Sequence, residues 1–434
     1  MIKKTTILFI LLIITNCSFD TRSGIWTKGE DISKENDIKT RILFENEKVL
    51  KRQFNTDFII KTPLLLNHNE IKAYSNNDYG IQNFSSDLKK ISKYNFSKIK
   101  NFDYFDPKVV FDNRNIIFFD KKGSIINFDE KTKIVWKKNF YSKNEKKLLP
   151  VLNFTIKDQA LFVSDNLSKY YLLNVKTGSI IWSREHNSTF ISQSKIDDRC
   201  IYIIDASNIF NCFSLKDGEK IWDFKLEKNF IKSQKKLSII YDEDKVYFNN
   251  SNGDIYALDK KNGNLVWLTP TKNDEGDFQT FKIKQSDLVL HNNQIYLSNN
   301  QNEFFSIDKM NGIINWTQNI NSHLRPIFSK NLIFTISTEG YLFVIEKISG
   351  NILRVNYLFN EFSKKKRKKI IPEGFALNET DIFLTLNNGR ILVIDIGSGT
   401  ATTKLKVSRD KISKPFINNK KMFIIKEDQI IKLY

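Results

Sequence analysis

The chain has 434 residues and a formal net charge of +19. Its length allows two or three ordinary domains, but repeat architectures break that expectation, so the organisation must come from the sequence pattern. The charge permits an anionic partner, yet Lys is spread along the whole chain as part of a general bias toward Lys, Asn and Ile, and we therefore expect no nucleic-acid partner.

The N-terminal stretch MIKKTTILFILLIITNCSFD is typical of an exported protein. Two lysines precede the apolar run Ile7 to Ile14, which is far shorter than the roughly 20 residues that a membrane-spanning helix needs. With Cys17 soon after the run, the stretch resembles a bacterial lipoprotein signal, although Asn16 stands where such signals usually have Gly, Ala or Ser. We predict a lipoprotein signal peptide over residues 1–16 and lipidation of Cys17; the alternative is ordinary secretion with cleavage nearby.

The next segment, residues 17–60, is predicted to be a polar tether with at most one short helix. It is charged, lacks a lasting apolar period, and has Trp26 as its one large anchor. The remaining residues, 61–434, are predicted to form one domain.

A segment such as ALDKKNGNLVW recurs along that domain. Five copies end at Trp136, Trp182, Trp222, Trp267 and Trp316, and two further copies have Arg354 and Thr403 at the Trp position. A glycine precedes this position in six copies, at Gly178, Gly218, Gly263, Gly312, Gly350 and Gly399. The mean spacing of roughly 44 to 45 residues, with strands alone inside it, is the signature of a β-propeller blade.

Each copy contains short strand-prone runs, as in Val246 to Phe248, Ile255 to Leu258 and Leu265 to Trp267, and an earlier apolar segment gives a fourth strand. Asn-Gly pairs between them supply the positive φ of tight hairpins. The Trp is expected to fill the wedge between diverging blades. An aromatic array that binds carbohydrate or a quinone is the alternative, but the rings recur once per blade and not in a cluster.

Seven units carry the motif, and the C-terminal stretch KPFINNKKMFIIKEDQIIKLY supplies only three strands of another. The segment around Ile91 has the pattern of an isolated outer strand, and pairing it with the C-terminal strands would close the ring and remove both sheet edges. The predicted fold is all-β: an eight-bladed β-propeller whose closing blade is built from both chain ends.

Repeats with Asp, Gly and Trp at this spacing resemble the PQQ-like propeller repeats. Together with the lipoprotein signal and the C-terminal closing blade, residues 88–434 resemble the BamB family of outer-membrane assembly lipoproteins. This resemblance implies a non-catalytic scaffold on the periplasmic face of the outer membrane, lipid-anchored, whose partner is a barrel-assembly protein with periplasmic domains. The alternative is a PQQ-like propeller that serves another envelope complex or binds a ligand or quinone.

An enzyme is disfavoured by the residues themselves. No two Cys are adjacent, as quinoprotein dehydrogenases typically have, and no Ser nucleophile motif or Gly-rich phosphate loop is present. The four His, at positions 68, 186, 291 and 323, show no ligand spacing, so we predict no metal site, no catalytic residues and no cofactor or small-molecule substrate.

Cys200 and Cys212 lie on consecutive predicted strands of one blade. An exported protein permits a disulfide between them if the turn brings their Cα atoms to about 5.5 Å. Two buried free thiols are the alternative.

Three connections between blades carry candidate surface features. The stretch after Trp222 offers an apolar and basic set, and the stretch after Trp267 an acidic one. BamB-like proteins use successive connections at this place to grip their partner, so the resemblance implies partner binding by Phe230, Ile231, Lys232, Lys235, Asp274, Glu275, Asp277 and Phe278. Two solvated loops are the alternative. The run SKKKRKK, residues 363–369, either is a solvated loop or contacts anionic head groups or an acidic partner.

Overall fold

The computed structural model describes residues 52–60, 84, 88–89, 91–100, 102, 105–227, 233, 235–271 and 283–434. All of them belong to the second of the two units into which the chain divides, Leu50–Tyr434. The predicted signal peptide and Cys17 lie outside the described residues.

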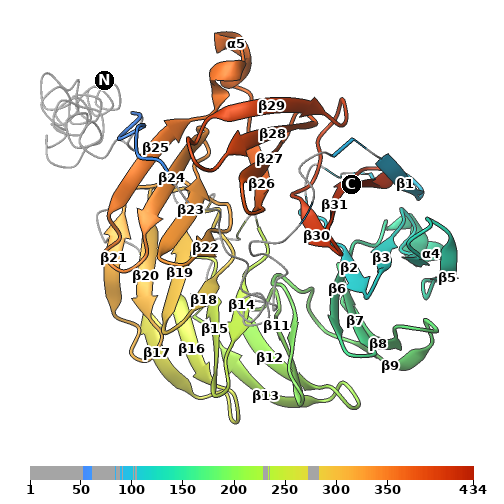
Figure 1. Cartoon of the computed structure of the whole chain (residues 1–434). Coiled ribbons are helices and arrows are strands. Elements are labelled where there is room, and N and C mark those ends of the chain that lie inside the picture. Colours follow the sequence, from blue (N-terminus) through green and yellow to red (C-terminus); the bar gives the residue numbers. More distant parts are fainter. Residues whose placement is uncertain are drawn as a thin grey trace, which may run out of the picture. The chain divides into compact units, whose positions relative to one another are not determined.

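In this part of the chain the strands form eight four-stranded antiparallel sheets, arranged as the blades of a propeller (Figure 1). Blade 1 is β2 (Val110–Asp112), β3 (Asn115–Phe119), β4 (Ile125–Phe128) and β5 (Ile134–Lys138). Blade 2 is β6 (Leu152–Lys157), β7 (Ala160–Asp165), β8 (Lys169–Asn174) and β9 (Ile180–Glu185). Blade 3 is β10 (Lys195–Ile196), β11 (Cys200–Ile204), β12 (Ile209–Ser214) and β13 (Lys220–Lys225). Blade 4 is β14 (Ile239–Tyr241), β15 (Lys245–Asn249), β16 (Ile255–Asp259) and β17 (Leu265–Thr269).

The second half of the ring follows the same order. Blade 5 is β18 (Val289–His291), β19 (Gln294–Ser298), β20 (Phe304–Asp308) and β21 (Ile314–Gln318). Blade 6 is β22 (Ile327–Ser329), β23 (Leu332–Ile336), β24 (Tyr341–Glu346) and β25 (Ile352–Tyr357). Blade 7 is β26 (Pro372–Leu377), β27 (Asp381–Leu386), β28 (Arg390–Asp395) and β29 (Ala401–Lys406). Blade 8 is β30 (Phe416–Asn418), β31 (Lys421–Lys426), β32 (Gln429–Leu433) and β1 (Ile91–Asn95).

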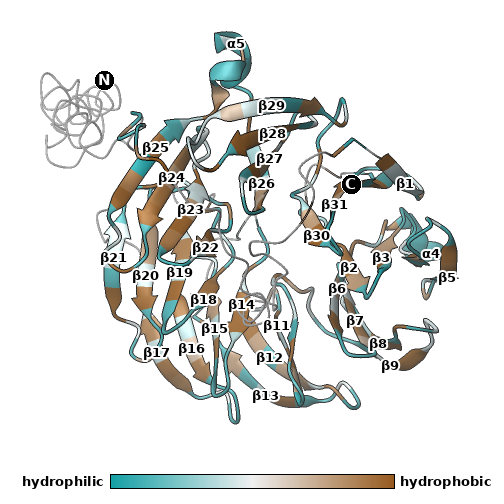
Figure 2. Ribbon diagram, in the orientation of Figure 1, coloured by the Kyte–Doolittle hydropathy of each residue, from teal (hydrophilic) through white to brown (hydrophobic). Residues whose placement is uncertain are grey.

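Burial explains why the strands within one blade differ in sequence. The middle strands, such as β16, are covered on both faces by neighbouring blades and are almost wholly buried, so they are nearly continuous apolar runs (Figure 2). The outermost strands, such as β17, bury only alternate residues and expose the rest. The three strands predicted around Trp267 are therefore present, each extended by one or two residues.

The ring closes as predicted, because a strand that precedes blade 1 in the sequence joins the three C-terminal strands. Strand β1 pairs with β32 from Ile91 opposite Leu433 to Asn95 opposite Gln429. Tyr94 of β1 is buried against Phe128 of blade 1, which joins the closing blade to its neighbour. Strand β32 is thus paired on both sides, with β31 and with β1, and the eight-bladed fold is confirmed.

The repeated Trp and Gly residues meet across each boundary between blades. Each indole packs on the glycine of the following blade, and its N–H donates to the carbonyl three residues before that glycine. The pairs are Trp136 with Val175 (3.0 Å), Trp182 with Leu215 (3.0 Å), Trp222 with Lys260 (3.2 Å), Trp267 with Lys309 (3.1 Å) and Trp316 with Lys347 (3.2 Å). The Trp therefore packs the boundary and also satisfies a turn carbonyl.

Arg354 replaces the indole at the boundary between blades 6 and 7. Its side chain is fully buried, and its Nη2 donates to the carbonyl of Ile396 at 2.8 Å, which is the same position that each Trp contacts. Its Nη1 donates to the carbonyls of Gly397 and of Phe58, the latter at 2.9 Å. A buried guanidinium is stable here because carbonyl acceptors surround it.

The Phe58 contact belongs to a short segment that lies along β25. Phe54 forms an antiparallel bridge with Val355, with N to O distances of 3.0 and 2.9 Å, and Asn55 Nδ2 donates to the carbonyl of Leu353 at 2.9 Å. The sequence assigned residues 17–60 to a tether; the last part of that range instead lies on the outer edge of blade 6.

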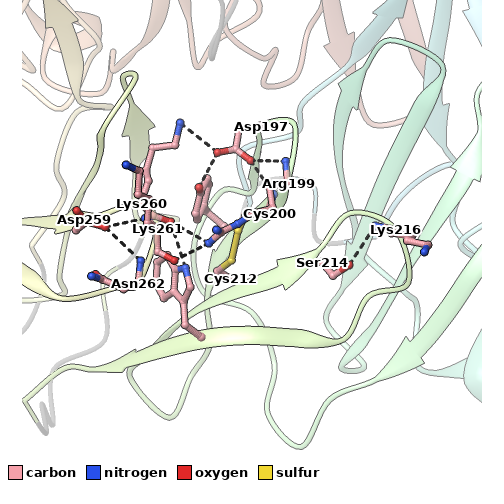
Figure 3. The surroundings of a disulfide bond; sticks show 12 residues. Asp197, Arg199, Cys200, Cys212, Ser214, Lys216, Asp259, Lys260, Lys261 and Asn262 are labelled. Carbon is pink, nitrogen blue, oxygen red and sulfur yellow. Dashed lines mark hydrogen bonds and ion pairs between the residues drawn. A yellow bond between two sulfur atoms is a disulfide. The ribbon is translucent and has the colours of Figure 1, made fainter.

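A disulfide joins Cys200 and Cys212 on adjacent strands of blade 3, with a Cα–Cα distance of 5.4 Å (Figure 3). Beside it, Asp197 accepts from Tyr202 OH at 2.7 Å and from Lys260 Nζ of blade 4 at 3.1 Å. Asp242, Tyr247 and Lys309 repeat this arrangement between blades 4 and 5, at 2.9 and 3.1 Å. These ion pairs between neighbouring blades fix the relative positions of blades 3, 4 and 5.

Helices are few among the described residues and lie in the connections: α4 (Lys143–Lys147), the 3-10 helix η4 (Phe359–Glu361) and α5 (Lys364–Arg367). None of the described helices is long and apolar enough to cross a membrane.

Candidate functional site

The connections between blades share one rim of the propeller. Each blade has four antiparallel strands, so the outermost strand ends on the rim where the innermost strand of the next blade begins. Each connection therefore runs from the periphery to the axis. Around the axis the eight blades enclose a cavity of about 390 Å³.

The axial cavity is strongly charged. Six basic residues line it, and three acidic residues partly balance them, which leaves a formal charge of +3. The basic set is Lys235, Lys236, Lys284, Arg325, Lys411 and Lys414; the acidic set is Asp106, Asp287 and Glu373.

Asp287 joins three successive connections. Its carboxylate accepts from Gln193 Nε2 at 2.8 Å and forms an ion pair with Lys235 Nζ at 3.2 Å. Burial acts to raise the pKa of Asp287, but the charges of Lys235, Lys414 and Arg325 outweigh it and hold the pKa below its ordinary value. The connections that enter blades 3, 4 and 5 are thus held together by one ionised, buried carboxylate.

Two further ion pairs cross the cavity wall: Lys414 Nζ lies 2.8 Å from Asp106, and Lys411 Nζ lies 3.3 Å from Glu373. Burial raises the pKa of Glu373 to about 7, although the charge of Lys411 opposes that change. The charge of the cavity therefore depends on pH near neutrality.

Two other groups respond to the same low-dielectric surroundings. Burial lowers the pKa of Lys236 to about 8, and its Nζ donates to the carbonyl of Phe190 at 3.5 Å. Burial, with the charge of Lys235, lowers the pKa of His323 to about 3, so its imidazole is neutral at physiological pH. Charge in this cavity is thus carried by amino and guanidinium groups and carboxylates.

Of the eight residues predicted to bind a partner, the structure describes Lys235. It lies in the axial cavity and pairs with Asp287, an engagement that the sequence did not predict. The other seven, Phe230, Ile231, Lys232, Asp274, Glu275, Asp277 and Phe278, lie outside the described residues.

The ends of the two connections that carry them lie among the described residues. Leu226 and Leu237 are buried at the ends of the first, and Leu237 exchanges backbone hydrogen bonds with the preceding connection at Ile191 and Gln193. Thr271 and Ile283 are buried at the ends of the second. The structure thus brings the bases of both connections together on one rim.

Sequence reasoning missed Asp287, Gln193 and Glu373, which lie next to or within innermost strands where no spacing distinguishes them. Residues 139–151 and 358–371, which contain α4 and α5, form connections as long as residues 226–238.

The described residues contain no group of three or more His, Cys, Asp or Glu side chains arranged to hold a metal ion. His186 pairs with Asp205 at 2.8 Å, His291 is buried between strands, and His323 faces the axial cavity, whereas His68 lies outside the described range. The candidate site is therefore a set of connections, joined by ion pairs and hydrogen bonds, around a cationic cavity.

Comparison with known proteins identifies the repeat. The family model described as outer membrane protein assembly factor BamB matches residues 121–356. No curated protein matches the sequence. Among solved structures, BamB from Moraxella catarrhalis is similar with a TM-score of 0.63 at 13% identity, covering 79% of this chain and 100% of that one.

Other propellers are similar to a comparable degree. Quinohemoprotein alcohol dehydrogenase from Comamonas testosteroni gives a TM-score of 0.57 at 10% identity, covering 83% of this chain and 79% of that one. The C-terminal WD40 domain of Sif2 gives 0.58 at 11% identity, covering 82% and 99%. At these identities the likenesses establish the fold alone.

Proposed function

We infer that this chain, which belongs to the family of the outer membrane protein assembly factor BamB, is a non-catalytic scaffold subunit of the outer-membrane β-barrel assembly machinery. Its partner would be a barrel-assembly protein with periplasmic domains. The family match over residues 121–356 supports an assembly role, and the propeller supplies a rigid frame for binding.

The observation that carries this proposal is the meeting of successive connections at Asp287. Lys235 comes from one candidate partner-binding connection and Asp287 ends the next, and their side chains lie 3.2 Å apart. Two connections with fixed bases can present one combined surface to a partner. In that surface Phe230, Ile231 and Lys232 would supply an apolar and basic patch, and the acidic residues of the second connection would orient the partner.

The anchor is the second part of the proposal. Cys17 would carry the lipid that holds the protein on the periplasmic face of the outer membrane, with residues 1–16 removed as a signal peptide. Ser18 follows Cys17 where enterobacterial lipoproteins retained in the inner membrane have Asp, which favours the outer membrane. Cys17→Ala should release the protein into the soluble periplasm or leave it unprocessed, and a mature N-terminus beyond residue 17 without lipid would contradict this part.

Co-purification from solubilised envelopes tests the scaffold role. Ile231→Asp, or Asp274→Lys together with Asp277→Lys, should abolish recovery of the barrel-assembly protein. Lys143→Gln in α4, an exposed residue of another long connection, is the matched control and should leave recovery intact. Undiminished recovery with both loop variants, in protein of normal thermal stability, would place the binding surface elsewhere.

A second candidate function has its own support. The axial cavity, with its cationic lining and the aromatic side chains of Phe105, Phe190 and Phe375, has the size and chemistry of a site for an organic anion, and a quinohemoprotein dehydrogenase shares the fold. The alternative is therefore a PQQ-like propeller that serves another envelope complex or binds a ligand or quinone. A bound quinone would show cofactor absorbance when the protein is purified from its native envelope.

A further inference from the structure

The connection between β25 and β26 carries the densest positive charge of the chain. Helix α5 together with Lys368 and Lys369 gives six consecutive basic residues. Figure 1 shows α5 protruding from the ring, and Figure 2 shows that it is hydrophilic. The five lysines of this run, Lys364, Lys365, Lys366, Lys368 and Lys369, are exposed, and none of them forms an ion pair with any described carboxylate. The lysines of the axial cavity differ, because three of those are paired.

Hydrogen bonds to backbone carbonyls hold the basic run in place. Arg367 turns back toward the ring, where its Nε donates to the carbonyl of Phe362 at 2.7 Å and its Nη2 to the carbonyl of Asn360 at 2.9 Å. Asn387 Nδ2 of blade 7 donates to the carbonyl of Lys369 at 3.0 Å. One basic residue therefore fixes the helix while the five lysines remain exposed.

The docked segment before blade 1 approaches the same place. It runs antiparallel to β25, from Asn55 beside Leu353 to Gln53, whose Oε1 accepts from the backbone N–H of Tyr357 at 3.4 Å. Tyr357 is the last residue of β25, and the chain continues from it into η4 and α5. Gln53 therefore lies at the end of β25 from which the chain continues into η4 and the basic run.

We propose that α5 with Lys368 and Lys369 is a contact site for an anionic phospholipid surface and sets the orientation of the propeller on the membrane. This inference rests on the proposed lipidation of Cys17. The 35 residues between Cys17 and Gln53 can span up to roughly 120 Å when extended, so the anchor alone does not fix which side faces the membrane.

Lipid is favoured over an acidic protein by the shape of the site and its position. The lysines belong to a helix of four residues, none of which is buried, and such an exposed cluster of ammonium groups suits a diffuse layer of phosphate groups. Gln53 lies at the end of β25 from which the basic run continues. Phe54 in the docked segment and Ile371 after the basic run are 50% and 42% exposed, as side chains at a membrane interface often are.

Depth measurement on the mature protein tests the proposal. A spin label on Ser363→Cys is suitable because Ser363 is exposed and its side chain makes no capping hydrogen bond, while Cys200 and Cys212 are joined. The protein is reconstituted on vesicles of phosphatidylcholine, with or without phosphatidylglycerol. We expect the label to lie at the head groups of the mixed vesicles only, and to leave them at high salt.

The variant changes Lys364, Lys365 and Lys368 to Gln, and should lower occupancy of the head-group position by about fivefold per lysine. The matched control changes Lys143, Lys146 and Lys147 of α4 to Gln and should have no effect. An equal label depth on both vesicle types, or no effect of the α5 variant, would overturn the proposal.

The outcomes separate this inference from the proposed function. If Cys17 carries no lipid, the protein will not stay on neutral vesicles. Flotation with the mixed vesicles then tests the site, and we expect the α5 variant, but not the α4 control, to weaken it. If the label stays in water on all vesicles but is protected by solubilised envelope proteins, an acidic protein occupies the site and the lipid proposal is rejected. Neither label depth nor flotation depends on recovery of the barrel-assembly protein, so each proposal can fail without the other.

Discussion

The indole of Trp222 lies against the Cα of Gly263 in the following blade, so that a Cβ on residue 263 would sit 2.4 Å from Trp222 Cε3. Gly263 also has a φ of +77°, which side chains rarely tolerate. The first repeat shows what happens where the preceding blade has no Trp. There Thr132 occupies the glycine position with a φ of +69°, and blade 8 instead contributes Tyr94 and Lys432, which contact the carbonyl of Glu130.

Gly263→Ala should lower the free energy of unfolding by about 2–4 kcal/mol, because it adds both backbone strain and a clash with Trp222. Thr132→Gly is the control and should be neutral or stabilise by up to about 1 kcal/mol, since it relieves the same strain without a neighbouring indole. Urea unfolding measures both. Equal effects of the two changes would show that the Trp contact contributes nothing.

Arg354→Leu should destabilise the protein by about 2–4 kcal/mol, because the carbonyls of Ile396, Gly397 and Phe58 would lose their buried donor. It should also loosen the segment that docks on β25, which trypsin can report by faster cleavage after Arg52. Arg390→Leu, which removes a half-buried guanidinium near a single carbonyl, is the control. An unchanged cleavage rate in Arg354→Leu would mean that the segment is held by its backbone bridge alone.

Deleting residues 415–434 should remove β30, β31 and β32, expose the edge of β1 and the apolar faces of blades 7 and 1 that pack on blade 8, and favour aggregation. Size-exclusion chromatography and thermal unfolding would detect it. Deleting Tyr434 alone, which lies beyond β32, should leave a soluble, folded protein. A soluble and normally folded product of the longer deletion would contradict ring closure by β32.

Cys200→Ala with Cys212→Ala should lower the free energy of unfolding by about 3 kcal/mol, as expected for a loop closed over 12 residues of separation. Mass spectrometry of the unreduced mature protein should find both thiols blocked. Alkylation of either Cys under denaturing, non-reducing conditions would show free thiols instead.

Glu373 should make stability fall as pH rises from about 4.5 to about 7. Its folded pKa, raised by burial to about 7, exceeds the unfolded value, so the folded state binds more protons in this window, and the favourable contribution present at lower pH is lost as Glu373 ionises. The effect is on the order of 3 kcal/mol at most. Glu373→Gln should reduce this slope and stabilise the protein at pH 8, whereas the exposed Glu361→Gln should not. Thermal melts across this pH range measure the difference.

The sequence determined the repeat, the strands and the closure of the ring. Those features have local signatures: turn residues such as Asn262-Gly263, apolar runs such as Ile255 to Leu258, and a C-terminal unit short of one strand. Each depends on neighbours within a few residues, so periodicity alone could reveal it. The family also followed from the repeat.

The tertiary structure decided which groups meet across blades. Trp222 and Gly263 are separately visible in the sequence, but their contact is not, because it joins different repeats. In the sequence Arg354 is a degenerate Trp position; the structure shows that its guanidinium donates to three carbonyls.

The axial cavity and the docked segment were beyond sequence reasoning for the same reason. The pairing of Lys235 with Asp287, and of Arg354 with the carbonyl of Phe58, joins residues far apart in the chain whose local sequence shows no pattern. Charges and polar groups are brought together there by the ring itself, and low-dielectric burial then sets their pKa values. Blade formation is a local property of the sequence, whereas the electrostatics of the axis and the way the N-terminal segment enters the propeller exist only once the eight blades have closed.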